Sequence, residues 1–332
     1  MSTPEAPAAL PLEGAPPAAG QSPIRSGRVE GFLSSGIGAL PGVPASLLGE
    51  SPMWHPGEQV LYWCDIPGQR LNRFDPASGG HAQWDFDSEV ACCAPLHDGG
   101  LLLALRSGLV RFDPAHGRSR SLVKAPYDPA HERFNDGKAD PRGRFWVGTI
   151  FEPRDAARAA LYRYAAGQLD RMATDITVSN GLAWSSDART LYWADTPAHS
   201  VYAFDFDIGS GGISGQRVFA QFPVKTPGQP LSGYGGRPDG AAMDAEGGYW
   251  VAMFEGARLL RIAADGRTTH ELPLPVRCPT MPCFGGADLR TLYITTSRER
   301  RPEDELAREP LAGCVLQLRT QVPGLPAHFV QL

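Results

Sequence analysis

The chain has 332 residues, with 31 Lys and Arg against 36 Asp and Glu, which gives a formal net charge of -5. This balance provides no broad positive field for phosphate backbones, so nucleic acid is excluded as a partner. Hydrophobic residues make up 42% and charged residues 20%, and 38 Gly and 31 Pro interrupt the chain throughout. Such frequent interruption favours many short strands and excludes a helical bundle.

The first thirty residues are rich in Ala and Pro and have neither a basic start nor a continuous apolar stretch. They do not resemble a secretory signal, and we expect a disordered tail over residues 1–37. No apolar run in the sequence approaches the ~20 residues of a membrane-spanning helix. The six cysteines lack the spacing of a zinc site, and we expect single buried thiols. We therefore predict a cytoplasmic protein with no membrane partner.

The rest of the chain, residues 38–332, repeats one pattern six times. In each copy an aromatic or aliphatic strand is followed by a short gap and a second strand, and several copies then have Asp-Pro or an acidic turn with Gly. The copies are residues 61–79, 101–117, 144–168, 191–211, 249–267 and 292–319. Their spacing of roughly 40 to 60 residues is typical of propeller blades and leaves room for four strands each. A β-sandwich also contains similar hairpins, but six copies at near-even spacing favour an all-β, six-bladed β-propeller with a central channel.

Four short segments place polar groups at the edges of the apolar strands. They are LLGESPMW at 47–54, ERFNDGKADPRGRFWVGT at 132–149, SNGLAWSSD at 179–187 and RPDGAAMDAEGGYWV at 237–251. The last three share an Asn or Asp beside Gly, followed by a small or apolar stretch and an aromatic strand. If the blades superpose, equivalent positions lie at the same depth around the channel. The candidate residues are Asn135 with its neighbour Asp136, Asn180, Asp239 and, from the first segment, Glu50.

Carboxylate and amide oxygens that converge from several blades are the ligands that a hard divalent cation selects. Asn-Gly and Asp-Gly are also common turn formers, and each pair taken alone fits that simpler explanation. Taken together, and in phase with the repeat, they favour a metal site. An oxygen-only site with few ligands accepts several ions, so one divalent ion is expected and Ca, Zn, Mn and Mg stay open.

These segments, with CFGG at 283–286, resemble the senescence-marker-protein, gluconolactonase and luciferin-regenerating-enzyme family. The resemblance covers essentially everything after residue 40. It implies a six-bladed propeller with one catalytic divalent cation in the channel and lactonase activity on sugar lactones. It also implies that Glu50, Asn180 and Asp239 are the metal ligands.

The same resemblance assigns substrate contacts to Arg133 and Asn135, the Arg and Asn of the RFNDGK segment. Relatives also contact substrate through a Glu shortly after the Gly-Thr of the same blade. The nearest candidate for that residue here is Glu152, which Pro153 follows. The segment 224–238, inserted just before Asp239, is expected to form a lid or rim that helps to select the lactone.

A lactone is a cyclic ester, and its hydrolysis needs an activated water, a polarised carbonyl and a stabilised oxyanion. We expect a hydrolase that opens aldonolactones to aldonic acids in sugar catabolism, with Asp239 as both metal ligand and general base. Its expected partner is a small-molecule sugar lactone, and its expected state is a monomer or weak homodimer. Two alternatives stay open: a calcium-binding regulatory propeller without catalysis, and a propeller esterase or phosphotriesterase. A serine-esterase mechanism has no support, because the sequence has no Gly-x-Ser-x-Gly elbow.

Overall fold

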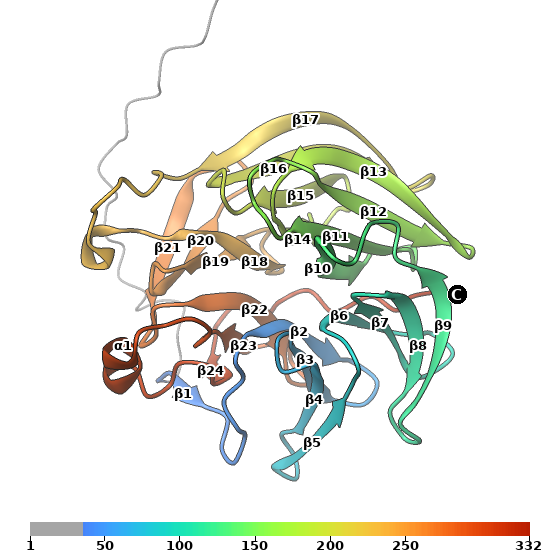
Figure 1. Ribbon diagram of the computed structural model, residues 1–332, viewed down its shortest axis with the longest axis horizontal. Helices are drawn as coiled ribbons and strands as arrows, with labels where there is room; N and C mark the ends of the chain where they lie inside the picture. Colours follow the sequence, from blue (N-terminus) through green and yellow to red (C-terminus); the bar gives the residue numbers. More distant parts are fainter. Residues whose placement is uncertain (1–35) are drawn as a thin grey trace, which may run out of the picture.

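The computed structural model describes residues 36–332, whose strands form six four-stranded sheets arranged around a central channel (Figure 1). Neighbouring strands in these sheets are antiparallel, and in five of the six sheets they follow one another in chain order. The predicted six-bladed β-propeller is therefore confirmed. Of the tail expected over residues 1–37, all but the last two residues lie outside the described residues.

Five blades are each built from four consecutive strands, numbered outwards from the channel. Blade 1 holds β2 (Gly49–His55), β3 (Val60–Asp65), β4 (Arg70–Asp75) and β5 (Gly80–Asp85). Blade 2 holds β6 (Val90–Pro95), β7 (Leu101–Leu105), β8 (Gly108–Asp113) and β9 (Arg118–Lys124). Blade 3 holds β10 (Glu132–Ala139), β11 (Phe145–Phe151), β12 (Ala159–Ala165) and β13 (Gln168–Ile176). Blade 4 holds β14 (Ser179–Trp184), β15 (Thr190–Asp195), β16 (Ser200–Asp207) and β17 (Gly212–Gln221). Blade 5 holds β18 (Arg237–Met243), β19 (Tyr249–Phe254), β20 (Arg258–Ile262) and β21 (Thr268–Pro273).

The sixth blade closes the ring with strands from both ends of the described chain. Its strands are β22 (Pro279–Gly285), β23 (Thr291–Thr296), β24 (Leu316–Arg319) and, outermost, β1 (Gly38–Ala39). Strand β1 pairs antiparallel with β24, placing Gly38 opposite Gln317 and Ala39 opposite Leu316. This closure joins the two ends of the described chain in one blade and ties residue 38 to it.

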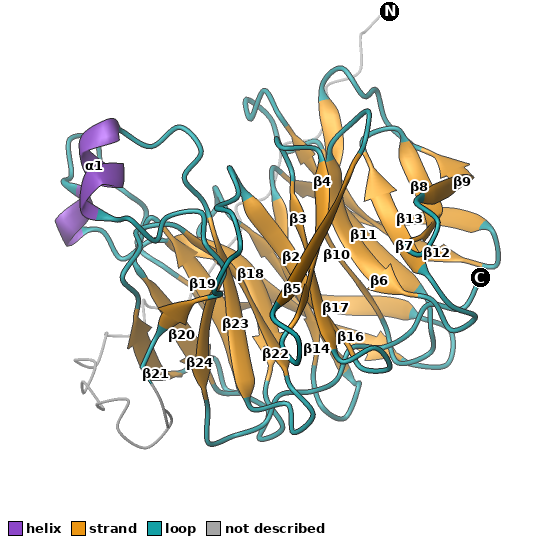
Figure 2. Cartoon of the chain, turned by 90° about the horizontal axis from the view of Figure 1, so that it is seen from below, coloured by secondary structure: helices purple, strands orange, loops and turns teal. Residues whose placement is uncertain are grey.

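Among residues 36–332, two short helical segments interrupt the strands, η2 (Leu231–Gly233) and α1 (Glu303–Arg308). In the side view, α1 stands out beyond the ends of the strands (Figure 2). No helix in the part of the chain from residue 36 onward is long and apolar enough to cross a membrane.

The six repeats found in the sequence are the second and third strands of each blade. Inner strands such as β2 are buried along their whole length, whereas outer strands such as β5 are largely exposed. The two middle strands carry most of the large apolar side chains that pack against neighbouring blades. That is why they give the strongest repeating signal.

Tryptophans of the second strands anchor four blades. Trp63, Trp146, Trp193 and Trp250 are fully buried in the core. Each indole N–H also donates to a side-chain oxygen nearby. The acceptors are Ser46 Oγ at 3.3 Å, Asp140 Oδ2 at 2.9 Å, Ser179 Oγ at 2.6 Å and Asp244 Oδ2 at 2.8 Å. Large apolar rings are thus buried without leaving their N–H groups unsatisfied.

All six cysteines are free, and four of them are buried. The neighbours Cys92 and Cys93 pack into two different hydrophobic clusters, as expected for successive residues of a strand. Burial raises the pKa of the Cys92 thiol well above its usual range. These are unreactive packing residues.

The last residues, 321–332, form a strap that crosses the centre of the ring (Figure 1). Backbone hydrogen bonds tie this C-terminal strap to four blades. They run from Gly324 N to Leu289 O, Leu325 N to Met243 O, Val330 N to Pro95 O, and Gln331 N to Gly143 O. Since Met243 and Pro95 end the inner strands β18 and β6, the strap covers the channel end at which inner strands finish.

Candidate active site and metal centre

Every inner strand carries a break in its pairing register, and the predicted ligands lie at these breaks. The register shifts between Glu50 and Met53 in β2, between Asn180 and Ala183 in β14, and between Pro238 and Ala241 in β18. A bulge of this kind bends the strand and redirects its side chains. The bulges therefore aim the oxygen-bearing side chains of three blades towards one region.

Glycines make these bulges possible. Gly181 has a φ of 63°, and a Cβ there would lie 2.4 Å from the hydroxyl oxygen of Tyr249. A Cβ on Gly240 would lie 2.4 Å from the Cβ of Met281 in the next blade. The Asn-Gly and Asp-Gly pairs are thus parts of inner strands at places of close approach rather than turns.

The bulges open into a cavity of about 420 Å³ at the channel end where the inner strands begin. Five of the predicted site residues line it: Glu50, Arg133, Asn135, Asn180 and Asp239. All five are buried, so they form the floor of the cavity. The structure thus brings together every predicted residue except Asp136 and Glu152, which do not line the cavity.

Among residues 36–332, neither carboxylate at the floor forms an ion pair, and the nearest cations, Arg133 for Glu50 and Arg237 for Asp239, only partly offset their charge. Burial is the main cause that raises the pKa of Glu50 well above its usual range, and repulsion from Asp239 and Asp136 adds to it. Burial likewise raises the pKa of Asp239 to about 8. The buried Oδ1 of Asp239 has no hydrogen-bond partner. A pair of buried carboxylates with an unpartnered oxygen fits a divalent cation, which would supply the missing charge.

The third predicted ligand, Asn180, is an amide, so the floor of the cavity holds two carboxylates and not a cluster of three acidic side chains. Among residues 36–332, no group of three or more His, Cys, Asp and Glu side chains is placed to hold a metal ion. The set at the floor consists of two carboxylates and the carboxamide of Asn180. This low total charge with oxygen donors only still suits a hard cation that keeps water or substrate in its shell.

A chain of hydrogen bonds orients Asn180. Asn135 Nδ2 donates to Asn180 Oδ1 at 2.7 Å, and Asn180 Nδ2 donates to Thr196 Oγ1 at 2.8 Å. Thr196 in turn donates to the carbonyl oxygen of Pro238 at 2.8 Å. Arg133 begins the chain by donating to Asn135 Oδ1 at 2.8 Å. The amide nitrogen of Asn180 is thereby held away from the carboxylates, and its oxygen keeps one lone pair for a ligand.

Arg133 and Glu152 belong to a charged network beside the floor. Arg106 donates two hydrogen bonds to Glu152, at 2.8 and 2.9 Å, and two to Glu89, both at 2.8 Å. The Arg133 Nε lies 3.7 Å from Glu152 Oε1. Burial lowers the pKa of Arg133, and Glu152 is the largest opposing influence. In this arrangement Glu152 positions Arg133, and its direct contact with substrate stays a prediction.

Asp136 lies in the wall of the channel rather than on the cavity surface. Its Oδ2 accepts a hydrogen bond from Leu182 N at 2.9 Å, and its Oδ1 has no partner. Lys138, two residues on, is buried and donates to the carbonyl oxygen of Ala241. Burial lowers the pKa of Lys138, and the nearby charge of Asp136 partly opposes this shift. The two charges of this stretch of β10 thus partly balance each other across the wall.

Several cavity residues were missed by sequence reasoning. Thr196, Arg154 and Glu255 lie at strand ends or in loops, without a repeated neighbour to mark them. Arg237 begins the RPDG segment but was not singled out. Glu299, Arg300 and Arg301 come from the insertion between β23 and β24. The run Arg-Glu-Arg-Arg at 298–301, unusual in an acidic chain, was the available signal.

The predicted rim over 224–238 reaches the cavity through Arg237. Within this segment, Tyr234 is buried and its hydroxyl lies 2.6 Å from His199 Nε2. Lys225 lies over the Tyr234 ring, 5.6 Å from its centroid. The segment is therefore packed against blade 4 and frames one side of the opening.

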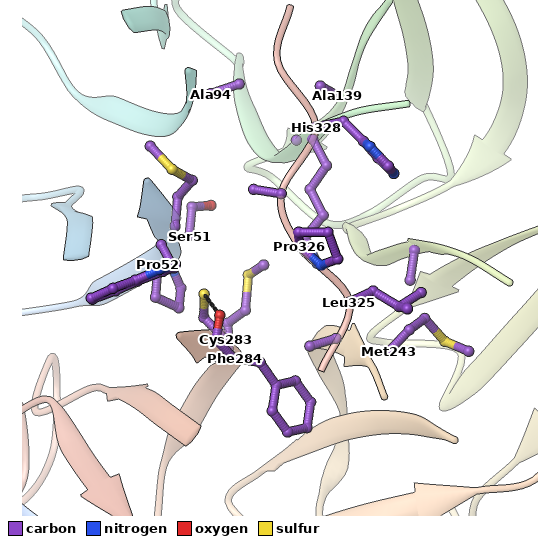
Figure 3. A pocket seen from close by; sticks show the side chains of 18 of the residues that line it. Ser51, Pro52, Ala94, Ala139, Met243, Cys283, Phe284, Leu325, Pro326 and His328 are labelled. Atoms are coloured by element: carbon purple, nitrogen blue, oxygen red, sulfur yellow. Dashed lines mark hydrogen bonds between the residues drawn. The ribbon is translucent and has the colours of Figure 1, made fainter. Parts of the chain in front are cut away.

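A second, smaller cavity of about 120 Å³ lies at the other end of the channel (Figure 3). Later residues of the same inner strands line it, together with Leu325, Pro326 and His328 of the C-terminal strap. Its walls are mostly apolar, and Cys283 Sγ makes only a weak bond of 3.5 Å to Phe284 O. Without clustered carboxylates, this end does not offer the chemistry of the first cavity.

The fold and the site together place this chain among six-bladed propellers that gather carboxylate and amide oxygens at one end of the channel, where they suit a metal ion. The family described as the SMP-30/Gluconolactonase/LRE-like region matches residues 48–298, and the chain belongs to this family. A 6-deoxy-6-sulfogluconolactonase of Pseudomonas putida is 46% identical over 84% of this chain and 93% of its own length. A pentonolactonase of Haloferax volcanii is 35% identical, over 84% and 93% respectively. The structure of a calcium-binding protein, regucalcin, from Agrobacterium tumefaciens has a TM-score of 0.82 at 27% identity, covering 89% of this chain and 97% of that one.

Proposed function

We propose that this chain is a sugar lactonase that uses one divalent cation, held by Glu50, Asn180 and Asp239, to open aldonolactones to aldonic acids in sugar metabolism. Family membership and the lactonase names of two relatives support the reaction class. The observation that carries the cation site is the meeting of these three side chains at bulges of three inner strands, with one Asp239 oxygen left without a partner.

A bound divalent cation would polarise the lactone carbonyl and offset the charge of the oxyanion. Asp239, through the carboxylate oxygen that is not engaged with the cation, would accept a proton from the water that attacks the carbonyl carbon. The bond from that carbon to the ring oxygen then breaks, and the ring oxygen takes the proton held by Asp239 and leaves as a hydroxyl group. Arg133 presents its guanidinium to hydroxyl or carboxylate oxygens of the sugar, and Asn135 holds the Asn180 amide in place.

The candidate substrates include neutral and charged sugar lactones, since one relative is named for a sulfonated gluconolactone and another for pentonolactones. The free cysteines suit the reducing cytoplasm that we propose as its compartment. Calcium is one candidate ion, with Zn, Mn and Mg as the others.

The test is acid release from a panel of pentono- and hexonolactones by protein stripped of metal and reloaded with Ca, Mn, Mg or Zn. We expect at least one lactone to be hydrolysed only after reloading. Cation binding without acid release from any lactone would favour the calcium-binding alternative. Hydrolysis that is confined to aryl esters or phosphotriesters would favour the esterase alternative.

A further inference from the structure

Three arginines line the cavity above the carboxylate floor. Arg154 comes from the loop between β11 and β12, Arg237 from the start of β18, and Arg300 from the insertion after β23. Arg154 and Arg300 are exposed and Arg237 is half-buried, whereas the floor residues are buried. The arginines therefore form the mouth of the cavity.

These guanidinium groups are close enough to repel one another. Partial burial of its guanidinium is the main cause that lowers the pKa of Arg154, the charges of Arg237 and Arg300 lower it further, and Glu299 and Asp239 oppose them. Within residues 36–332, the Arg154 side chain makes no hydrogen bond and no ion pair, although its backbone bonds to Phe151. Arg154 also has a φ of 57°, in the left-handed region that strains a non-glycine residue. An unpaired cation is thus held beside two others.

The carboxylates at the mouth do not neutralise this charge. Glu255 is shared by Arg301 at 3.0 Å, Arg237 at 3.5 Å and Lys225 at 4.0 Å. Arg301 is further held by two hydrogen bonds of 2.7 Å to Glu305, so it is already paired. Glu299 lies 3.6 Å from its neighbour Arg300 and also acts on Arg154, so one carboxylate is divided between two arginines. Positive charge therefore prevails at the mouth, in a chain whose formal net charge is -5.

The arginines lie above the floor, where they would meet the end of a sugar lactone that is far from its carbonyl. Arg237 and Asp239 line the same cavity, with the buried Asp239 at the floor and the half-buried Arg237 at the mouth. A lactone whose carbonyl reaches the floor would therefore have its far end towards the mouth, where the guanidinium groups lie. Planar guanidinium forks match tetrahedral oxyanions, which accept several hydrogen bonds at once.

We propose that Arg154, Arg237 and Arg300 form an anion subsite, and that the preferred substrate is a sugar lactone with a sulfonate or phosphate on the carbon farthest from its carbonyl. This inference rests on the proposed lactonase function and specifies its substrate class. Arg154 is the key residue, because its guanidinium has no competing partner in the described part of the chain.

The experiment compares wild-type protein with Arg154→Gln on three lactones: gluconolactone, 6-phosphogluconolactone and 6-deoxy-6-sulfogluconolactone. For the wild type, kcat/KM is expected to be at least tenfold higher for a charged lactone than for the neutral one. The Gln variant should lose at least tenfold of this ratio, and added salt should lower the wild-type ratio by screening. Comparison of the two charged lactones shows whether the subsite prefers a sulfonate or a phosphate group.

The matched control is Arg158→Gln, which removes the same charge from the same loop. Arg158 lies over the ring of Phe151, 5.2 Å from its centroid, and does not line the cavity. The control should keep the wild-type ratio. An Arg154→Gln protein that also keeps it, or a wild type without preference for charged lactones, would overturn the subsite.

Binding of ring-opened products separates this inference from the lactonase proposal. Calorimetry with 6-phosphogluconate, 6-deoxy-6-sulfogluconate and gluconate reports on the subsite even if no lactone is hydrolysed. Tighter binding of a charged acid that is lost in Arg154→Gln supports the subsite whatever the reaction. Hydrolysis of neutral lactones with equal binding of all three acids would leave the lactonase standing and refute the subsite.

Discussion

Replacing Thr196 by Val tests whether the hydrogen-bond chain through Asn180 prepares the cation site. Val has nearly the shape of Thr but lacks the hydroxyl that accepts from Asn180 Nδ2 and donates to Pro238 O, both at 2.8 Å. An unsatisfied buried polar group costs about 1 to 3 kcal/mol. Since Asn180 borders the cavity, where water can reach its amide, we expect the lower end of that range for each group and about 2 kcal/mol of lost stability in total.

The larger effect should fall on cation binding. Without Thr196, the Asn180 amide can rotate and present its nitrogen to the cation, and loss of such supporting contacts typically weakens metal affinity ~10- to 100-fold. That corresponds to about 1.4 to 2.8 kcal/mol. Calorimetric titration of metal-free protein with Ca or Mn measures it directly. Thr196→Ser, which keeps the hydroxyl, is the control and should bind like the wild type. Wild-type affinity in Thr196→Val would refute the positioning role.

Three further predictions concern the floor and its scaffold. Asp239→Ala should abolish lactone hydrolysis, and retained activity would contradict its role. The melting temperature of the metal-free protein should not fall, because the substitution removes a carboxyl group whose charged form burial already disfavours. Gly181→Ala should lower the free energy of unfolding in urea by roughly 1–3 kcal/mol and weaken cation binding, because the added Cβ meets Tyr249 and the φ at this position is positive. Unchanged stability and binding would mean that the bulge is not required. Trp250→Phe should lower the free energy of unfolding by roughly 1–3 kcal/mol in the same assay, because the hydrogen bond to Asp244 and part of the packing are lost. Unchanged stability would argue against the anchoring role of this tryptophan.

The fold could be predicted because the middle strands of every blade repeat the same apolar pattern at near-even spacing. The inner strands gave no such alternation, since strands such as β2 and β14 are buried on both faces. Ring closure by β1 was not foreseeable from a stretch as short as Gly38–Ala39. The course of the C-terminal strap depends on contacts with four blades that are distant in sequence.

The floor of the site was accessible to sequence reasoning because Asn180 and Asp239 recur beside glycine in phase with the repeat. The sequence also suggested turns at these pairs, and only the pairing register reveals them as bulges. The mouth was not accessible, because Arg154 and Arg300 lie in loops whose paths are set by tertiary packing. Thr196 was hidden for a different reason, since a single hydroxyl after a strand has no distinguishing pattern.

The most direct test of the proposed cation-dependent chemistry is a titration of metal-free protein with one divalent cation while acid release from a sugar lactone is recorded. We expect no release above the uncatalysed rate at the start, and a rise that reaches its plateau near one cation per chain. In Asp239→Ala the same titration should stay flat. Full activity in the presence of a strong chelator, or an undiminished rise in the variant, would contradict the proposal.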